Sequence, residues 1–156
     1  MRRHTARPSV SPVGSTETYT STSGVTTTVD VPAGAVTETT TLEYAADVPV
    51  AERPGGFWFA GQSFTLDGYQ GGEYVTGLTF SDPVTVTLHY TDADVIGLDE
   101  DGLLIEYWDE GAGAWQDAAC GAYNRHPDEN WLAVPICHLS EFALFGKPKQ
   151  VFPTEC

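Results

Sequence analysis

The clearest strand signal in the sequence is Pro-Val-Thr-Val-Thr-Leu-His-Tyr at residues 83–90. Every second side chain in it is apolar, at Val84, Val86, Leu88 and Tyr90. Successive side chains of a β-strand point to opposite faces of a sheet. We therefore predict a strand with one buried face and one solvent face that carries His89. Proline stands at the first position, where its missing N–H costs least.

The same period of two recurs in other short segments, which Gly, Pro and Asp separate. The segments are residues 25–31, 42–46 and 103–107, and two further apolar runs follow at residues 131–136 and 139–145. No segment keeps a helical period over three turns, although residues 92–98 could form one helical turn with Asp92 as its N-cap. Short strands with turn signals every ~8–12 residues predict an all-β fold, either a sandwich or a barrel.

The two ends of the chain differ in composition from its centre. Residues 1–23 are polar and rich in Ser, Thr and Pro, which predicts a flexible linker or tail. We expect one folded domain over residues 24–146 and a short C-terminal tail over residues 147–156. No apolar stretch follows the N-terminal arginines, so no targeting peptide is visible. The chain is then either cytosolic or, as we favour, a fragment of a longer exported protein.

The charge of the chain excludes several classes of partner. Among 156 residues, 22 are Asp or Glu and 7 are Lys or Arg, which gives a net charge of −15. Nucleic acids are bound through Lys and Arg, so we expect none here. An acidic body also repels acidic lipids, and no apolar run approaches the ~18 residues of a membrane span. A divalent cation is the partner that such a body would attract.

The three cysteines are Cys120, Cys137 and Cys156. In a reducing cytosol all three would be thiols. In an oxidising compartment Cys120 and Cys137 could pair across 16 intervening residues. A loop of that size removes roughly 3 kcal/mol of unfolded-chain entropy. Cys156 would remain, as an intermolecular partner or a free thiol.

An acidic segment at residues 92–102 is the candidate calcium site. Its candidate ligands are Asp92, Asp94, Asp99 and Asp101. Calcium takes six to eight oxygen ligands, which clustered carboxylates supply. The segment departs from the EF-hand pattern, because Ile96 and Leu103 stand where acids belong. A solvated acidic turn between two strands is the alternative that we favour.

Aromatic residues and histidines offer two further kinds of site. The large aromatics are Phe57, Trp58, Phe59, Trp108, Trp115 and Trp131. They could stack on a sugar, but in a domain of this size they more often fill a core. The histidines outside the last apolar runs are His4, His89 and His126, and no two of them have metal-ligand spacing. Since the chain also lacks Cys-x-x-Cys, we expect no zinc site.

The sharpest motif is His138-Leu139-Ser140. Strict alternation from Leu132 to Leu144 would place His138 and Ser140 together on the apolar face, ~6.6 Å apart along the strand. Histidine is suited to act as a base near neutral pH, and a serine hydroxyl can attack the preceding carbonyl if the peptide is strained. The alternative is that both side chains simply bond to neighbouring backbone in the last core strand.

Five short stretches resemble one family in order along the chain. They are residues 29–36, 83–86, 97–100, 115–118 and 138–144. Over about Gly24 to Gly146 the chain resembles bacterial cell-surface versions of the ZU-5 domain of ankyrins, netrin receptors and tight-junction scaffolds. The resemblance implies an antiparallel β-sandwich that serves as a non-enzymatic interaction or spacer module. In some ZU-5 domains and in adhesion-type receptors a similar tripeptide cleaves itself, which would make His138 the base and Ser140 the nucleophile.

These observations together predict one antiparallel β-sandwich with a Cys120–Cys137 disulfide. We expect a non-catalytic extracellular module of a larger bacterial surface or secreted protein, with no cofactor and with other proteins or domains as partners. Self-cleavage between Leu139 and Ser140 is the first alternative. Calcium-supported binding of a ligand or carbohydrate is the second.

Overall fold

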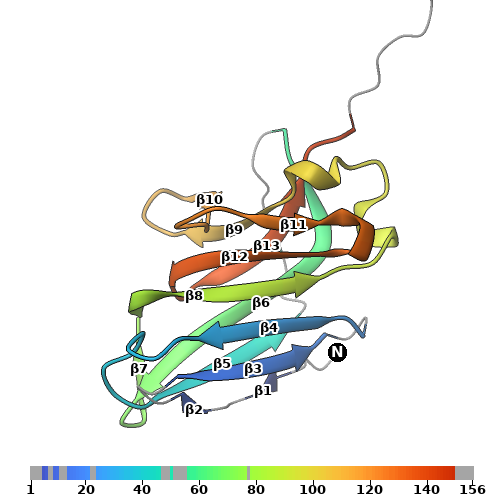
Figure 1. Ribbon diagram of the computed structural model, residues 1–156. Helices are drawn as coiled ribbons and strands as arrows, with labels where there is room; N and C mark the ends of the chain where they lie inside the picture. Colours follow the sequence, from blue (N-terminus) through green and yellow to red (C-terminus); the bar gives the residue numbers. More distant parts are fainter. Residues whose placement is uncertain are drawn as a thin grey trace, which may run out of the picture.

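The computed structural model describes residues 5–6, 9–10, 14–21, 24–46, 50, 56–76 and 78–149. Within these residues the chain forms two antiparallel sheets that pack face to face, so the fold is the predicted all-β sandwich (Figure 1). No helix in the described part is long and apolar enough to cross a membrane. The short strands and turns predicted from the sequence thus form a two-layer structure with one main core.

The smaller sheet has the strand order β11-β12-β8-β4-β3. Its strands are β3 (Ser15–Thr20), β4 (Thr26–Val31), β8 (Thr79–His89), β11 (Asn124–His126) and β12 (Trp131–His138). Strand β8 contains residues 83–89 of the alternating stretch, and Val84, Val86 and Leu88 are all buried. It lies between β12 and β4, with Val86 opposite both Val134 and Val29.

The larger sheet has the order β1-β5-β6-β13-β9-β10, with β2 beside β5 and β7 beside β6. Its strands are β1 (Thr5–Ala6), β2 (Ser9–Val10), β5 (Thr40–Ala46), β6 (Trp58–Gln70), β7 (Glu73–Val75), β9 (Leu104–Asp109), β10 (Ala114–Asp117) and β13 (Glu141–Gly146). The last strand, β13, lies in the middle of this sheet between β6 and β9. The chain therefore changes sheets between β12 and β13.

Alternate side chains of both sheets fill the space between them. The largest wholly buried ones in this main core are Tyr44, Phe64, Phe142, Leu42, Leu66, Leu88, Leu103, Ile105, Leu132, Ile136 and Leu144. Phe145 belongs to a second, smaller cluster with Trp115 and Ala143, against which Phe57 and Trp108 pack. Three of the candidate sugar-stacking aromatics, Phe57, Trp108 and Trp115, thus contribute to a packed cluster.

The expected N-terminal linker is wrong for residues 15–20, which form the edge strand β3. Ser15 to Thr20 pair with Val31 to Thr26 of β4. Tyr19 is buried and stacks on Tyr44 of the opposite sheet with ring centroids 4.3 Å apart. An edge strand needs only one apolar anchor when its other face is in solvent, so its composition resembles that of a linker.

The expected C-terminal boundary after residue 146 is also too early. Asp99 N–H donates to the Lys147 carbonyl at 2.9 Å, and Lys149 N–H donates to the Gly97 carbonyl at 2.8 Å. Residues 147–149 are therefore bound to the turn that follows β8. That turn contains the predicted single helical turn, η1 (Ala93–Val95), and a second one, η2 (Glu100–Gly102).

Candidate functional site

The candidate site is the connection between β12 and β13, where the chain passes from one sheet to the other. The register between β12 and β8 shifts between Ile136, which faces Val84, and His138, which faces Thr79. This β-bulge turns the backbone, so Leu139 rather than its neighbours enters the core. Leu139 N–H donates to the Leu78 carbonyl at 2.8 Å.

The expectation that His138 and Ser140 share the core face is wrong. Both side chains are half-buried, whereas Leu139 between them is only 4% exposed. Strict alternation fails because the bulge inserts an irregular step and because the chain leaves one sheet and enters the other here.

The two polar side chains of the motif contact different backbone carbonyls. His138 Nδ1 lies 3.3 Å from the Leu139 carbonyl oxygen, and its ring meets Tyr107 edge-on at 4.5 Å. Ser140 Oγ donates to the Trp108 carbonyl at 3.3 Å. Both contacts agree with the non-catalytic alternative given above, in which each side chain simply hydrogen-bonds to nearby backbone.

A pocket of about 350 Å³ opens beside the motif. His138, Leu139 and Ser140 line it together with four carboxylates, those of Asp67, Asp109, Glu110 and Glu141. Burial raises the pKa of Asp67, and the charge of Glu43 adds to the rise. Attack on the Leu139 carbonyl would develop negative charge on its oxygen, which needs donors rather than carboxylates. The surroundings therefore do not favour the transition state of self-cleavage.

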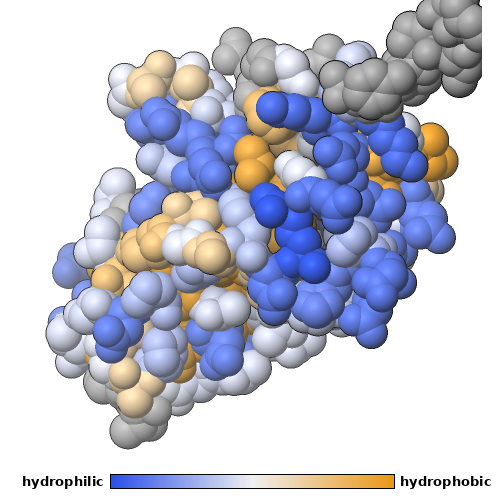
Figure 2. Space-filling model, turned by 45° about the horizontal axis from the view of Figure 1, so that its top comes forward, coloured by the Kyte–Doolittle hydropathy of each residue, from blue (hydrophilic) through white to orange (hydrophobic). Residues whose placement is uncertain are grey.

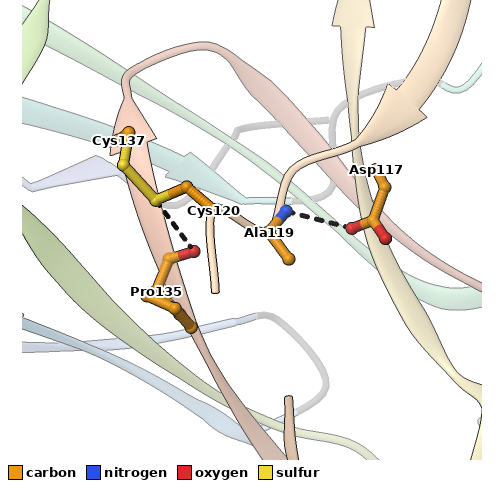
Figure 3. Close-up of a disulfide and its surroundings, with 5 residues drawn as sticks. All are labelled: Asp117, Ala119, Cys120, Pro135 and Cys137. Atoms are coloured by element: carbon orange, nitrogen blue, oxygen red, sulfur yellow. Dashed lines mark hydrogen bonds between the residues drawn. A yellow bond between two sulfur atoms is a disulfide. The ribbon is translucent and has the colours of Figure 1, made fainter. Parts of the chain in front are cut away.

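The Cys120–Cys137 disulfide is present, with its Cα atoms 6.1 Å apart, next to this motif (Figure 3). It joins the loop after β10, an edge of the larger sheet, to β12 of the smaller sheet. The Pro135 carbonyl accepts the Cys120 N–H at 2.9 Å, and a side chain at Gly121 would collide with the Pro135 ring. The loop is thus fixed to β12 by covalent and non-covalent contacts.

A polar network that sequence reasoning missed supports the same loop. Asp117 Oδ1 accepts the Tyr123 hydroxyl at 2.6 Å and the Ala119 N–H at 3.0 Å. Tyr123 Oη in turn accepts the Ile105 N–H at 3.0 Å. Burial and the nearby charge of Asp117 raise the pKa of Glu106 to about 7. In the sequence, Glu106 is distinguished only by its position in a predicted strand, residues 103–107, whose two faces could both be partly buried.

The four candidate calcium ligands do not converge. Asp94 Oδ2 accepts from Gln62 Nε2 at 2.8 Å and from Thr91 N–H at 2.9 Å. Asp92 instead accepts from Asn130, and Asp99 caps η2 by accepting the Asp101 N–H. Within the described residues, the carboxylates of Asp92, Asp94, Asp99 and Asp101 do not form a common cluster. The segment fits the alternative of a structured acidic turn.

A second pocket, of about 330 Å³, lies where β6 begins. Its apolar walls are Trp58, Phe59 and Ile96, which are 48%, 41% and 79% exposed. Asp94 lines it too, held by the two hydrogen bonds above. Asp94 can lie this close to β6 because residue 61 is a glycine in a left-handed conformation, and a Cβ there would overlap the Asp94 side chain. This pocket therefore brings aromatic surface and an oriented carboxylate together.

The histidines have separate surroundings. His89 Nδ1 lies 3.2 Å from Thr26 Oγ1 and its ring contacts Trp131, so it is less open to solvent than expected. His4 lies outside the described residues, as does Cys156.

Compared with known proteins, the chain matches no family, and no curated protein is similar to it in sequence.

Proposed function

We propose that this chain is a non-catalytic interaction module of an exported protein, and that the pocket at the start of β6 is its binding surface. The observation that carries the proposal is the gathering of exposed apolar side chains. Of the four large apolar side chains exposed in the described residues, Trp58, Phe59 and Ile96 line this one pocket. Exposed apolar patches of this kind mark interaction sites.

The disulfide supports the exported setting. Disulfides persist in oxidising compartments and are rare in the reducing cytosol. Cys120 and Cys137 join the two sheets, which suits a domain that must keep its shape without intracellular chaperones. The resemblance to bacterial cell-surface ZU-5 domains agrees with this setting and remains part of the proposal.

The charge of the chain supports a basic partner. The net charge is −15, and the pocket itself contains the carboxylate of Asp94. Figure 2 shows a face on which hydrophilic side chains surround small hydrophobic patches. Aromatic rings attract cationic side chains through their faces, and an acidic body accelerates encounter with a basic partner. The partner that fits is therefore a protein segment with Lys or Arg beside apolar residues.

A panel of synthetic peptides that differ only in charge tests this function. We expect the chain to bind the cationic peptides and not their anionic counterparts. Trp58→Ala should weaken binding by about 2 kcal/mol, roughly thirtyfold in Kd, because a buried aromatic anchor dominates such interfaces. Tyr74→Ala is the matched control, since Tyr74 is equally exposed but outside this pocket. Equal binding of both peptide classes, or an unchanged Kd for Trp58→Ala, would contradict the proposal.

Self-cleavage at Leu139–Ser140 is the second candidate function. The observation in its favour is that His138 and Ser140 line one pocket on either side of that bond. For reaction, Ser140 Oγ would leave the Trp108 carbonyl, transfer its proton to His138 and attack the Leu139 carbonyl carbon. The amide nitrogen of Ser140 would then leave with that proton, and water would open the resulting ester.

Intact-mass analysis of the purified chain distinguishes the two functions. We expect one uncleaved species that persists for days at pH 7–8, because the His138 and Ser140 side chains each contact a backbone carbonyl rather than one another. Cleavage would instead release a fragment that begins at Ser140, and Ser140→Ala would abolish it. That result would establish self-cleavage and remove the non-catalytic part of the proposal.

A further inference from the structure

A second histidine neighbourhood lies at the opposite end of β12 from the His-Leu-Ser motif. The chain passes from β11 to β12 through a single helical turn, η3 (Pro127–Glu129). This turn brings donor atoms of His126, Asp128 and Glu129 within 4.8 Å of one another. His126 Nδ1 and Glu129 Oε1 are 3.6 Å apart. That separation is close to the spacing of two donors around one transition-metal ion with bonds of ~2.0–2.1 Å.

The imidazole of His126 is oriented for metal binding by groups outside the cluster. Its Nε2 donates to Asn124 Oδ1 at 2.9 Å, which leaves the lone pair of Nδ1 available beside Glu129. A hydrogen bond from the second ring nitrogen to an oxygen is the usual support of a metal-binding histidine. The ring also stacks on Trp131, with centroids 4.0 Å apart and planes 18° from parallel.

The backbone that carries the two acids is held in place as well. Asn130 ends the turn in a left-handed conformation, with φ of 58°. Its carbonyl accepts the Tyr90 N–H at 3.0 Å, and its side-chain amide donates to Asp92 Oδ1 at 2.9 Å. These contacts join the turn to the end of β8, so little ordering of the turn is needed on binding.

We propose that His126, Asp128 and Glu129 bind a divalent first-row transition metal ion of the Zn²⁺ type. One imidazole and two carboxylates supply three ligands and leave a position open to solvent, which fits zinc. Calcium is disfavoured, because it requires six to eight oxygen ligands.

The electrostatics around the turn support a cation. Arg125, which precedes His126 in the sequence, contacts other groups, since its Nε donates to the Leu103 carbonyl and its guanidinium lies over the Tyr123 ring. A net charge of −15 raises the local concentration of cations. The ion pair between His126 and Glu129 is exposed and so contributes little to stability by itself.

Calorimetric titration with ZnCl₂ tests this site in the full chain. The background carries His4→Ala and Cys156→Ser, which remove the histidine and the cysteine that lie outside the described residues. We expect saturable binding of one ion, a rise in Tm with added Zn²⁺, and no rise with Ca²⁺. His126→Ala should abolish saturable binding, whereas His89→Ala, the matched control, should retain it.

Two further variants separate metal binding from damage to the fold. Asp128→Asn with Glu129→Gln keeps the stacked ring and changes only exposed side chains, so it should lose binding while its metal-free Tm stays the same. Asn124→Ala should weaken Zn²⁺ binding by about 10- to 100-fold, because it removes the support of the imidazole. Absence of saturable Zn²⁺ binding, or binding that survives both His126→Ala and the double acid variant, would overturn the proposal.

Discussion

Strand β12 has a histidine neighbourhood at each end, and the two differ in what the imidazole contacts. At the C-terminal end, His138 lies against the Leu139 carbonyl and Tyr107, next to a disulfide and a buried leucine. At the N-terminal end, His126 is oriented by Asn124 and Trp131 toward two exposed carboxylates. The sequence motif indicates His138 as a candidate functional residue, whereas the arrangement of donor atoms in the structure favours His126. A short motif thus identifies residue types, and only the surroundings show which imidazole is available.

The largest effect on stability is expected from Leu139→Ala, which tests whether the packing of Leu139 in the core stabilises the connection after β12. Truncation of a buried leucine costs about 2–5 kcal/mol of unfolding free energy. Leu104→Ala is the matched control, because Leu104 is only partly buried on β9 and should cost less. Denaturant unfolding of both variants measures the difference, and equal losses would show that the core position of Leu139 is unimportant.

Removal of the disulfide should have the next largest effect. Cys120→Ala with Cys137→Ala should lower the unfolding free energy by about 3 kcal/mol, because the unfolded chain regains loop entropy. At about 2–4 °C per kcal/mol, the fall in Tm is readily measured. A reductant should lower the Tm of the native chain and leave that of the variant unchanged. Zn²⁺ binding at the other end of β12 should persist in the variant.

The stability of the fold should depend on pH through Glu106. The pKa of Glu106 is about 7 in the folded chain and ordinarily 4.5. Folding therefore favours the protonated acid, and the contribution of this acid to stability is full below pH ~4.5 and lost as pH rises through about 7. Glu106→Gln should therefore raise Tm more at pH 8 than at pH 4. Thermal unfolding of the native chain and the variant at both pH values measures this difference, and an equal change in Tm at pH 4 and pH 8 would contradict it.

The smallest effect is expected from Ser140→Ala. The variant loses one hydrogen bond to the Trp108 carbonyl, which contributes about 0.5–1.5 kcal/mol. Denaturant unfolding would detect this loss, and it should be well below that of Leu139→Ala. A loss as large as that of the leucine would show that Ser140, and not Leu139, holds the connection together.

Much of the fold could be predicted from local pattern. The alternation at residues 83–90 identified a strand with a buried face, because a strand exposes its side chains alternately to two environments. The pattern failed for β3, where Tyr19 is the only apolar side chain in Ser15–Thr20. It failed again at His138–Ser140, because a β-bulge and a change of sheet are properties of strand pairing and leave no local period.

The candidate sites were less predictable than the fold. The Cys120–Cys137 pair could be named because both cysteines lie in the predicted domain, whereas Cys156 lies in the predicted C-terminal tail. The Glu106–Asp117–Tyr123 network could not be named, since β9, β10 and the following loop meet only after folding. The spacing between histidines gives no signal for the proposed site at His126, whose neighbours are carboxylates two and three residues away on a tight turn.

The amino-acid sequence alone was enough to indicate the all-β class, the buried face of the central strand and the acidic character of the chain, because alternation is a local property and net charge is a sum over residues. The tertiary structure determines which side chains meet. It placed Leu139 in the core, brought Trp58, Phe59 and Ile96 around one pocket, and set the His126 ring between Asn124 and Trp131. These arrangements depend on register and on how the sheets are joined, and both are fixed by contacts between residues distant in sequence.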